Sequence, residues 1–259
     1  MTPTQLTETW GLLDRERLAA FARRGPSAVF ASVSGAHLYG FASRDSDVDL
    51  RGAFLHPLRA MLSLRPPRET ITLEENTDIE LDWVTHDLRK FVRLLTEDNG
   101  YVLEQLYSPL VVVESQTFHA LRELARGCIT RPTAKHYLGF GRGRRKRLRE
   151  PHPTVKHLLY GYRVYLTGIH LMQTGEVISN LPALNEIFRN TQIDELIARK
   201  REGQENEPLP PDEIDVHDSF LASLETTLVR AYESSQLPDA ATHVPALEEL
   251  VIRARLATG

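Results

Sequence analysis

The sequence has little of what covalent cross-links or membrane spans require. Cys128 is the single cysteine among 259 residues, which excludes an internal disulfide framework and a zinc site built from several cysteines. The longest apolar runs, such as 110–113, are far shorter than the roughly 20 residues that cross a bilayer. The first residues also lack the basic-then-apolar pattern of a secretory signal. We therefore expect a cytoplasmic globular protein without a membrane partner.

Charge is unevenly distributed along a chain of otherwise ordinary composition. Residues 201–259 carry twelve acidic and four basic side chains, a net charge of −8, and since the whole chain has −4, residues 1–200 carry +4. This asymmetry fits an anionic substrate held by the first part of the chain. It fits equally well a set of helices whose charged surfaces are only solvated.

Residue periodicity divides the chain into a small α/β part and a helical part. We expect a helix near 12–24, strands at 27–34 and 47–55, and a hairpin across 69–85 that turns near Glu75 and Asn76. Helical spacing follows at 86–97 and 101–108 and prevails beyond Ser115. The predicted domains are residues 1–113 and residues 114–259.

Two aspartates separated by one residue open the strand expected at 47–55. Asp47, Asp49 and Arg51 would share one face, because side chains alternate along a strand. Two carboxylates held side by side repel each other, and a divalent cation relieves this repulsion. Mg²⁺ suits the arrangement because it binds few carboxylates and keeps positions for water and phosphate oxygens. The alternative is two aspartates in a polar turn, since D-x-D often occurs by chance.

A glycine-containing turn precedes these aspartates. Gly35 follows the first strand directly, and Gly40 lets the chain bend back. Backbone amides in such a turn form an anion-binding site suited to phosphates. The two glycines have P-loop spacing, but Phe41 stands where that motif requires lysine, which excludes this class of ATPase. Together with the paired aspartates, the turn predicts a nucleoside triphosphate site, and the alternative is a purely structural turn.

The hairpin offers a third carboxylate. Glu80 and Asp82 share one face of its second arm, and we prefer Asp82, with Glu80 in reserve. Three acidic ligands suit two divalent ions about 3.5–4 Å apart, which hold the attacking and leaving oxygens of a phosphoryl displacement. One carboxylate can also accept the proton of the attacking hydroxyl. A solvated hairpin face is the alternative.

Basic residues mark the helical part. Six of them lie within eight positions: Arg142, Arg144, Arg145, Lys146, Arg147 and Arg149. A nucleic-acid backbone is the expected partner, and the alternative is pairing with the acidic C-terminal region.

The next helix has an apolar stripe and an opposite, polar face that runs from Lys156 to His170. We expect this face to overlook the cleft between the domains, with Lys156 contacting a triphosphate as a point charge and Tyr160 stacking on a base, although a solvated face is an alternative.

Taken together, these segments resemble a known superfamily. SGAHLYGFASRDSDVDLRG, residues 34–52, resembles the signature of the DNA polymerase β-type nucleotidyltransferases: a glycine turn, a short spacer, and a serine with D-x-D on a strand. DWVTHDLRKFVRLLTEDNGYVLEQLYSP, residues 82–109, is similar to the branch associated with RNA repair, and so is KHLLYGYRVYLTGIHLMQTGEV, residues 156–177. The resemblance covers roughly residues 28–180.

The resemblance implies roles for the matching positions. Asp47, Asp49 and Asp82 match the acidic metal ligands and catalytic residues, and Gly35 matches the phosphate-turn glycine. Ala36 departs from the pattern, because the family usually has serine there; a lost hydroxyl contact to phosphate costs about 1 kcal/mol unless Ser34 or His37 replaces it. The expected nucleotide-binding set is Gly35, Ala36, His37, Ser46 and Lys156.

Together, the residue patterns and the resemblance predict an α+β protein: a small, mixed, mostly antiparallel nucleotidyltransferase sheet with flanking helices, followed by an α-helical bundle that closes the cleft. We expect Mg²⁺, as two ions that Mn²⁺ can replace, to support transfer of a nucleoside monophosphate from a triphosphate to an acceptor hydroxyl. The resemblance and the basic run favour an RNA end as acceptor. A protein or small-molecule acceptor, a non-catalytic RNA- or protein-binding module, and a D-x-D glycosyltransferase are the alternatives.

Overall fold

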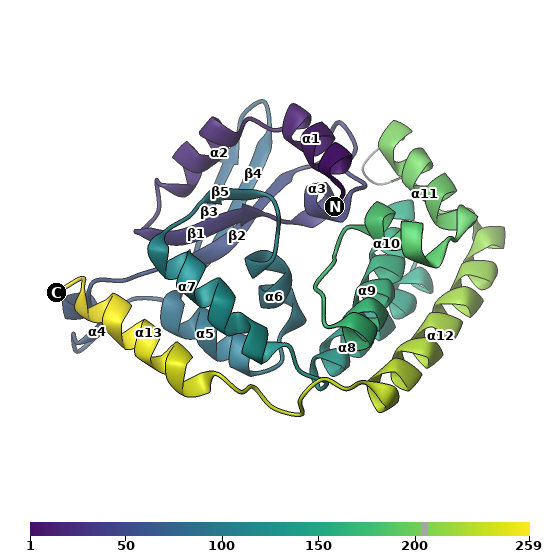
Figure 1. The fold of residues 1–259 in the computed structure, drawn as a ribbon. Helices are drawn as coiled ribbons and strands as arrows, with labels where there is room; N and C mark the ends of the chain where they lie inside the picture. The colour runs from purple at the N-terminus through teal and green to yellow at the C-terminus, as the bar shows by residue number, and fades with distance from the viewer. Residues whose placement is uncertain (204–206) are drawn as a thin grey trace. The chain divides into compact units, whose positions relative to one another are not determined.

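A computed structural model describes residues 1–203 and 207–259 (Figure 1). Within this part, five strands form one sheet in the order β3-β4-β2-β1-β5. They are β1 (Ala28–Val33), β2 (Val48–Phe54), β3 (Thr70–Asn76), β4 (Glu80–Asp87) and β5 (Val111–Val113). Strands β2 and β4 pair in parallel and the other neighbours pair antiparallel. The predicted α+β fold with a mixed, mostly antiparallel sheet and a following helical part is confirmed.

The chain divides into two compact units. The sheet unit contains residues 3–35, 47–130 and 240–259, and the helical unit contains residues 1–2, 36–46 and 131–239. Each unit includes segments from both sides of residue 113. Independent domains at 1–113 and 114–259 stay a prediction.

The sheet unit surrounds its sheet with helices. They are α1 (Pro3–Leu12), α2 (Arg15–Ala22), α4 (Leu58–Met61), α5 (Leu88–Thr96), α6 (Gly100–Leu106), α7 (Gln116–Leu124), the 3-10 helix η1 (Ala125–Cys128) and α13 (Val244–Leu256). Helix α5 buries Leu88, Phe91 and Leu95 on a single face, as helical periodicity requires. Phe30 of β1 contacts Phe91 edge-on and Phe118 of α7 by stacking, and these aromatic contacts join the helices to the sheet.

A buried ion pair fastens α13 to the sheet. Arg255 Nη2 lies 2.6 Å from Asp87 Oδ1, and Arg255 also donates to the carbonyl of His56. Asp87 in turn caps α5 by accepting from the amide of Arg89 at 3.0 Å. Since both charged groups are buried and hydrogen-bonded, residues 240–259 pack with the sheet unit despite their distance in sequence.

The helical unit is built around α9. Its helices are α8 (Thr133–Leu148), α9 (Val155–Thr174), α10 (Leu181–Phe188), α11 (Thr191–Glu202) and α12 (Pro211–Ser234), and it includes most of α3 (Gly35–Tyr39). Helices α8 and α9 approach closely because each presents a glycine to a tyrosine of the other. A Cβ on Gly141 would lie 2.3 Å from the Tyr165 ring, and one on Gly168 would lie 2.8 Å from Tyr137.

The second half of the polar face of α9 is buried, and its expected position at the cleft stays a prediction. Arg163, Thr167 and His170 are all buried. The guanidinium of Arg163 lies 4.0 Å from the centre of the Tyr39 ring. The helical period alone could not reveal this burial.

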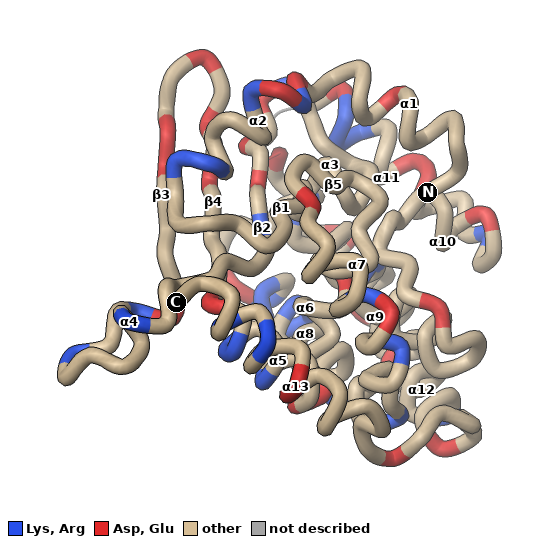
Figure 2. Tube along the Cα trace, turned by 60° about the vertical axis from the view of Figure 1, so that its left-hand side comes forward, with Lys and Arg blue, Asp and Glu red and all other residues tan. Residues whose placement is uncertain are grey.

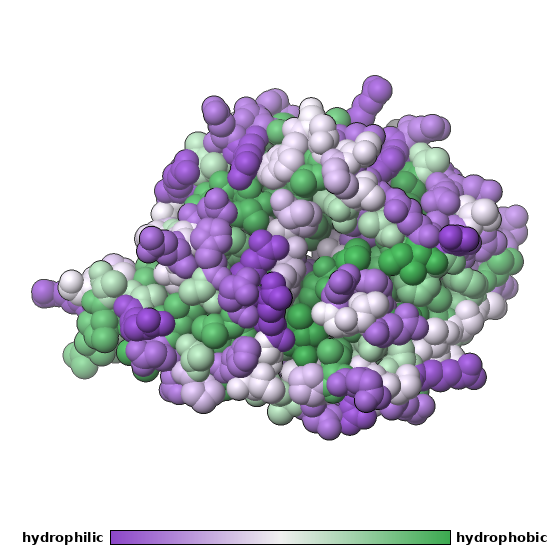
Figure 3. Space-filling view, viewed as in Figure 1, coloured by the Kyte–Doolittle hydropathy of each residue, from purple (hydrophilic) through white to green (hydrophobic). Residues whose placement is uncertain are grey.

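The surface is mostly hydrophilic on the face shown in Figure 3, with apolar areas such as the one over the end of α4, where Leu62 and Leu64 are exposed. No helix among the described residues is both long and apolar enough to cross a membrane.

Candidate active site

The parallel pairing of β2 and β4 places Asp49 directly opposite Asp82. The residues that alternate with them, Val48, Leu50 and Trp83 among others, are buried on the opposite face of the sheet. A register shift of one residue would bury the carboxylates and expose these apolar side chains, so the apolar pattern holds the register. The result is a pair of neighbouring carboxylates, 18% and 30% exposed.

Arg51 joins the two carboxylates. Its Nη2 donates to Asp49 Oδ1 at 2.6 Å and to Asp82 Oδ2 at 3.0 Å, and its Nη1 donates to the carbonyls of Leu50 and Asp82. Its Nε donates to the hydroxyl of Tyr101 at 3.1 Å. Burial opposes the charged form, but Tyr101, Asp49 and Asp82 together raise the pKa of Arg51 well above its ordinary value. A permanent positive charge therefore orients both carboxylates.

One carboxylate oxygen of this pair has no hydrogen-bond partner in the described part of the chain. Asp82 Oδ1 is buried and accepts no hydrogen bond from any described residue. Such an atom is costly to bury, and a cation, a proton or a ligand group would satisfy it. Glu80, the reserve for this role, lies before the first residue pair of β2 and β4 and is exposed. The geometry therefore favours Asp82 over Glu80.

The glycine turn packs against Asp49. Gly35 has φ +59°, and a Cβ at this position would lie 1.9 Å from Asp49 Oδ2. The amide of Ser34 donates to the carbonyl of Asp49 at 2.8 Å, and the Ser34 hydroxyl is buried without a partner among the described residues. Only glycine combines this backbone conformation with the lack of a side chain, so the turn and the carboxylate pair form one constellation.

The structure brings together Gly35, Asp49 and Asp82 of the predicted set. Asp47 is half-buried and lies one residue before β2 begins, not within the strand as expected. The remaining predicted nucleotide-binding residues belong to the helical unit: Ala36, His37, Ser46 and Lys156. Their contact with a nucleotide stays a prediction.

Ser46 and its neighbours have structural contacts inside the helical unit. Ser46 Oγ accepts from the amide of Ser43 and lies 3.0 Å from the Ser43 hydroxyl. The buried amine of Lys200 donates to Ser43 Oγ at 2.6 Å. Ala36 and His37 are also buried, whereas Lys156 on α9 is half-buried. Ser46, the serine of the predicted signature, thus stabilises the loop that precedes Asp47 through its hydrogen bonds with Ser43.

The donor set suits a hard cation only in part. Asp49 and Asp82 supply the oxygen ligands that Mg²⁺ prefers, and Mg²⁺ commonly takes one or two carboxylates with water and phosphate oxygens. The unpartnered Asp82 Oδ1 fits such a ligand. However, no three acidic, histidine or cysteine side chains of the described residues form a ready metal site, and Arg51 already neutralises part of the charge.

His86 lies further along β4 and is held neutral. Lys90 Nζ donates to Thr70 Oγ1 at 2.6 Å, and the same hydroxyl is hydrogen-bonded to His86 Nδ1, 2.9 Å away. Burial, followed by the charges of Lys90 and Arg51, lowers the pKa of His86 to about 4.

Stability is expected to fall as the pH drops from about 6.5 to 4. The unfolded chain protonates His86 near pH 6.5, so in this window it binds more protons than the folded chain, and acid favours unfolding. This group contributes less than about 1.4 kcal/mol per pH unit, because it is partly exposed. Melting temperatures measured across the window should depend less steeply on pH in His86→Gln than in the wild type or in the surface control His119→Gln. An unchanged slope in His86→Gln would contradict a neutral His86.

The basic run divides into two groups. Arg142, Arg145 and Arg149 form ion pairs with acidic residues of α12, at 2.7–2.9 Å: Glu225, Asp218 and Asp215. For these three arginines the alternative of pairing with the acidic C-terminal region is confirmed. Arg144 instead lies over the Tyr160 ring, 4.8 Å from its centre, and Lys146 and Arg147 are exposed. Because Tyr160 also contacts Tyr39 and Phe41 edge-on, its ring is largely occupied.

The sequence pattern did not predict the roles of two residues of the site. Arg51 was placed on the correct face, but its bridging role depends on β4, which pairs with β2 only in the folded chain. Tyr101 holds Arg51 from α6, fifty residues away, and no local signal indicates this.

Comparisons with known proteins agree with this geometry. The chain matches the RNA repair pathway DNA polymerase beta family, RlaP, over residues 13–253. An uncharacterized protein of Methanocaldococcus jannaschii is 30% identical over 155 residues, 59% of this chain and 63% of that protein, so this chain spans less than two thirds of its length. An uncharacterized protein of Bacillus subtilis is 29% identical over 191 residues, 70% of this chain and 72% of that protein. The predicted resemblance is confirmed. The chain therefore belongs to the RNA repair pathway DNA polymerase beta family.

Proposed function

We propose that this protein transfers a nucleoside monophosphate from a nucleoside triphosphate to a hydroxyl at an RNA end. The hydroxyl oxygen attacks the α-phosphorus, the bond from this phosphorus to the bridging oxygen breaks, and pyrophosphate leaves. The observation that supports it most is the register that sets Asp49 beside Asp82, with the Gly35 turn packed on Asp49.

The chain's own residues supply positioning and proton transfer. The turn at Ser34 and Gly35 offers its backbone and the partnerless Ser34 hydroxyl to the triphosphate. Ser34 lies two positions before Ala36, so its hydroxyl is our candidate to replace the missing serine. Asp82 Oδ1 accepts the proton of the attacking hydroxyl, and Arg51 holds both carboxylates in one orientation.

The proposed reaction also requires a divalent cation. Asp49 and Asp82, with Asp47 as a further ligand, would hold Mg²⁺ or Mn²⁺. When bound, the cation neutralises the charge of the triphosphate and of the leaving pyrophosphate.

A non-catalytic RNA- or protein-binding module is the second candidate. Two observations favour it: Ala36 lacks the hydroxyl of the family pattern, and Arg51 neutralises part of the charge of Asp49 and Asp82 without a metal ion. Such a module would bind triphosphates weakly and without magnesium dependence.

An incorporation assay tests the proposal. Purified protein and Mg²⁺ are mixed with each of the four α-labelled triphosphates and short RNAs, and Asp47→Asn/Asp49→Asn serves as the inactive control. Label on RNA from the wild type alone supports the proposal and identifies the donor. Label on the protein itself would redirect the acceptor to a protein hydroxyl. Absence of label, together with triphosphate binding that ignores Mg²⁺, would favour the non-catalytic module.

A further inference from the structure

Helix α8 presents three different faces. Ala134, Tyr137, Gly141 and Leu148 are buried. Arg142, Arg145 and Arg149 recur on a second face and form the ion pairs with α12 described above, and Figure 2 shows basic residues along α8 and acidic ones along α12. The third face is defined by the spacing i, i+4, i+8, i+11, which places its side chains in one row. These four residues, His136, Phe140, Arg144 and Arg147, are called the α8 row.

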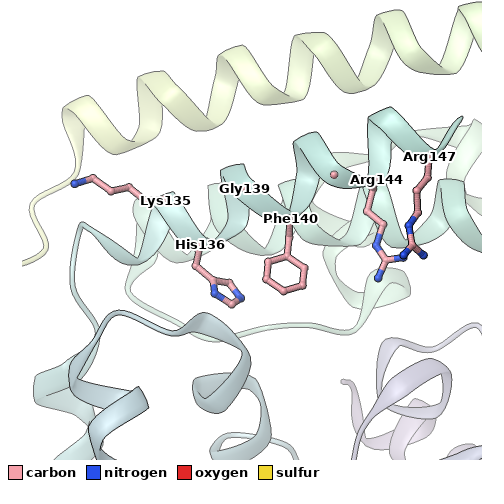
Figure 4. Close-up of a pocket in the computed structure, with 7 residues that line it drawn as sticks. Lys135, His136, Gly139, Phe140, Arg144 and Arg147 are labelled. Carbon is pink, nitrogen blue, oxygen red and sulfur yellow. The ribbon is translucent and has the colours of Figure 1, made fainter. Parts of the chain in front are cut away.

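The α8 row borders a hollow of about 500 Å³. Its lining is Lys135, His136, Gly139, Phe140, Gly143, Arg144 and Arg147. Figure 4 shows the row projecting from one side of the helix, whereas Lys135 points away from it. A Cβ on Gly139 or Gly143 would meet nothing within 4 Å, so the hollow exists where these two residues lack side chains.

Positive charge in the α8 row is not balanced. No carboxylate in the described part of the chain forms an ion pair with Arg144 or Arg147. Burial and then the charge of Arg147 lower the pKa of Arg144. Burial, followed by Arg144, Arg147 and Lys156, lowers the pKa of the neighbouring His157. Several cations therefore repel one another here, and a bound anion would relieve that repulsion.

Aromatic rings lie beside these charges. The rings of His136 and Phe140 stack with centroids 4.6 Å apart and planes at 27°, and Phe140 is 50% exposed. Burial and the charge of Arg163 lower the pKa of His136 to about 4, so its ring is neutral near pH 7. An exposed aromatic ring next to arginines that lack carboxylate partners among the described residues is the kind of feature that binds unstacked nucleotides, whose bases stack while their phosphates pair with the arginines.

We propose that the α8 row is a binding site for single-stranded RNA, in which a base stacks on Phe140 and adjacent phosphates contact Arg144 and Arg147. The choice of RNA rests on the proposed function, whereas the site itself rests on the hollow, the unpaired arginines and the stacked rings. Arg142, Arg145 and Arg149 are not part of this site, because α12 neutralises them.

A matched pair of double variants tests the charges. Arg144→Gln/Arg147→Gln and Arg142→Gln/Arg149→Gln remove the same charge from one helix, but only the first removes unpaired arginines. Binding of a labelled single-stranded RNA of about twelve nucleotides is measured by fluorescence anisotropy over a range of salt concentrations. We expect the first variant to bind at least tenfold more weakly, and the slope of log K against log salt to fall by about 1.4, which is two phosphate contacts. Wild-type affinity in this variant, or an equal loss in the control variant, would overturn the site.

Two uncharged substitutions test the hollow and the ring. Phe140→Ala is expected to weaken binding about tenfold by removing the stacking surface. Gly143→Leu fills the hollow without changing charge, and it should weaken binding while raising the melting temperature, since glycine is unfavourable in a helix. RNA binding that is unaffected by both would overturn the stacking site.

The two proposals fail independently. Anisotropy requires no triphosphate, so a protein that binds RNA through the α8 row but transfers no label would contradict only the proposed function. A protein that labels RNA and binds it equally well in all these variants would contradict only the α8 site. A same-length duplex RNA is expected to bind more weakly than the single strand, because its bases are already stacked, and tighter duplex binding would contradict the proposal.

Discussion

Asp49→Asn is expected to reduce nucleotidyl transfer about 10³-fold and to leave the protein folded. Asp49 contributes both to the carboxylate pair and to the glycine turn, because its Oδ1 accepts from Arg51 while its Oδ2 faces Gly35. Asparagine has nearly the same shape but no charge, so it removes the electrostatic contribution that phosphoryl transfer depends on, and groups of this kind are worth about 10²–10³ in rate. Loss of one charge-assisted bond to Arg51 costs only about 1–3 kcal/mol.

The same assay compares Asp82 with Glu80. Asp82→Asn is expected to match the loss in Asp49→Asn, since the two carboxylates are opposite each other and share Arg51. Glu80→Gln is the matched control, on the same strand and two residues away, and it should keep at least half of the wild-type rate. Initial rates of label incorporation and melting temperatures separate activity from folding. Full activity in Asp49→Asn, or a larger loss in Glu80→Gln than in Asp82→Asn, would contradict the assignment.

Gly35→Ala is expected to abolish more than 99% of activity and to lower the free energy of unfolding by on the order of 3 kcal/mol. At φ +59° an alanine is strained, and its Cβ would lie 1.9 Å from Asp49 Oδ2. The carboxylate must then rotate away, which breaks its hydrogen bond with Arg51 and opens the phosphate turn.

Two further glycine substitutions separate the backbone strain at Gly35 from the overlap of its new side chain with Asp49. Gly11→Ala, on α1, meets nothing within 4 Å, so it should keep full activity and gain up to about 1 kcal/mol of stability. Gly35→Asn keeps the overlap with Asp49 but tolerates a positive φ better than alanine. Chemical denaturation and transfer rates should therefore show Gly35→Asn inactive but less destabilised than Gly35→Ala. Wild-type activity in Gly35→Ala would mean that the turn and Asp49 do not act together.

Local patterns were sufficient for β1 to β4 and for the face on which Asp49 and Asp82 lie, but they did not predict β5 or α1. Alternation of apolar and polar residues predicted β2 and β4, with Asp49 and Asp82 on faces opposite the buried side chains. The turn of the hairpin lies at residues 77–79, slightly later than predicted. Local spacing could not predict that β4 also pairs with β2, because that parallel pairing joins segments separated by more than thirty residues.

The ion pairs of the folded chain could not be predicted from local sequence either. The six basic residues of 142–149 look alike in the sequence, yet α12 neutralises three of them and leaves Arg144 and Arg147 without carboxylate partners among the described residues. Asp87 and Arg255 are 168 residues apart and form a buried pair. Which ionic side chains are paired depends on where the folded chain brings them.

By itself, the sequence determined the family, the α+β class and the glycine turn followed by paired aspartates, since each depends on residue types at short, fixed spacings. Only the tertiary structure decided that Arg51 bridges Asp49 and Asp82 and that Arg163, Thr167 and His170 of α9 are buried. It alone also separated the paired from the unpaired arginines of α8. The physical reason is that burial and ion pairing depend on contacts between residues distant in sequence, which periodicity and spacing do not encode.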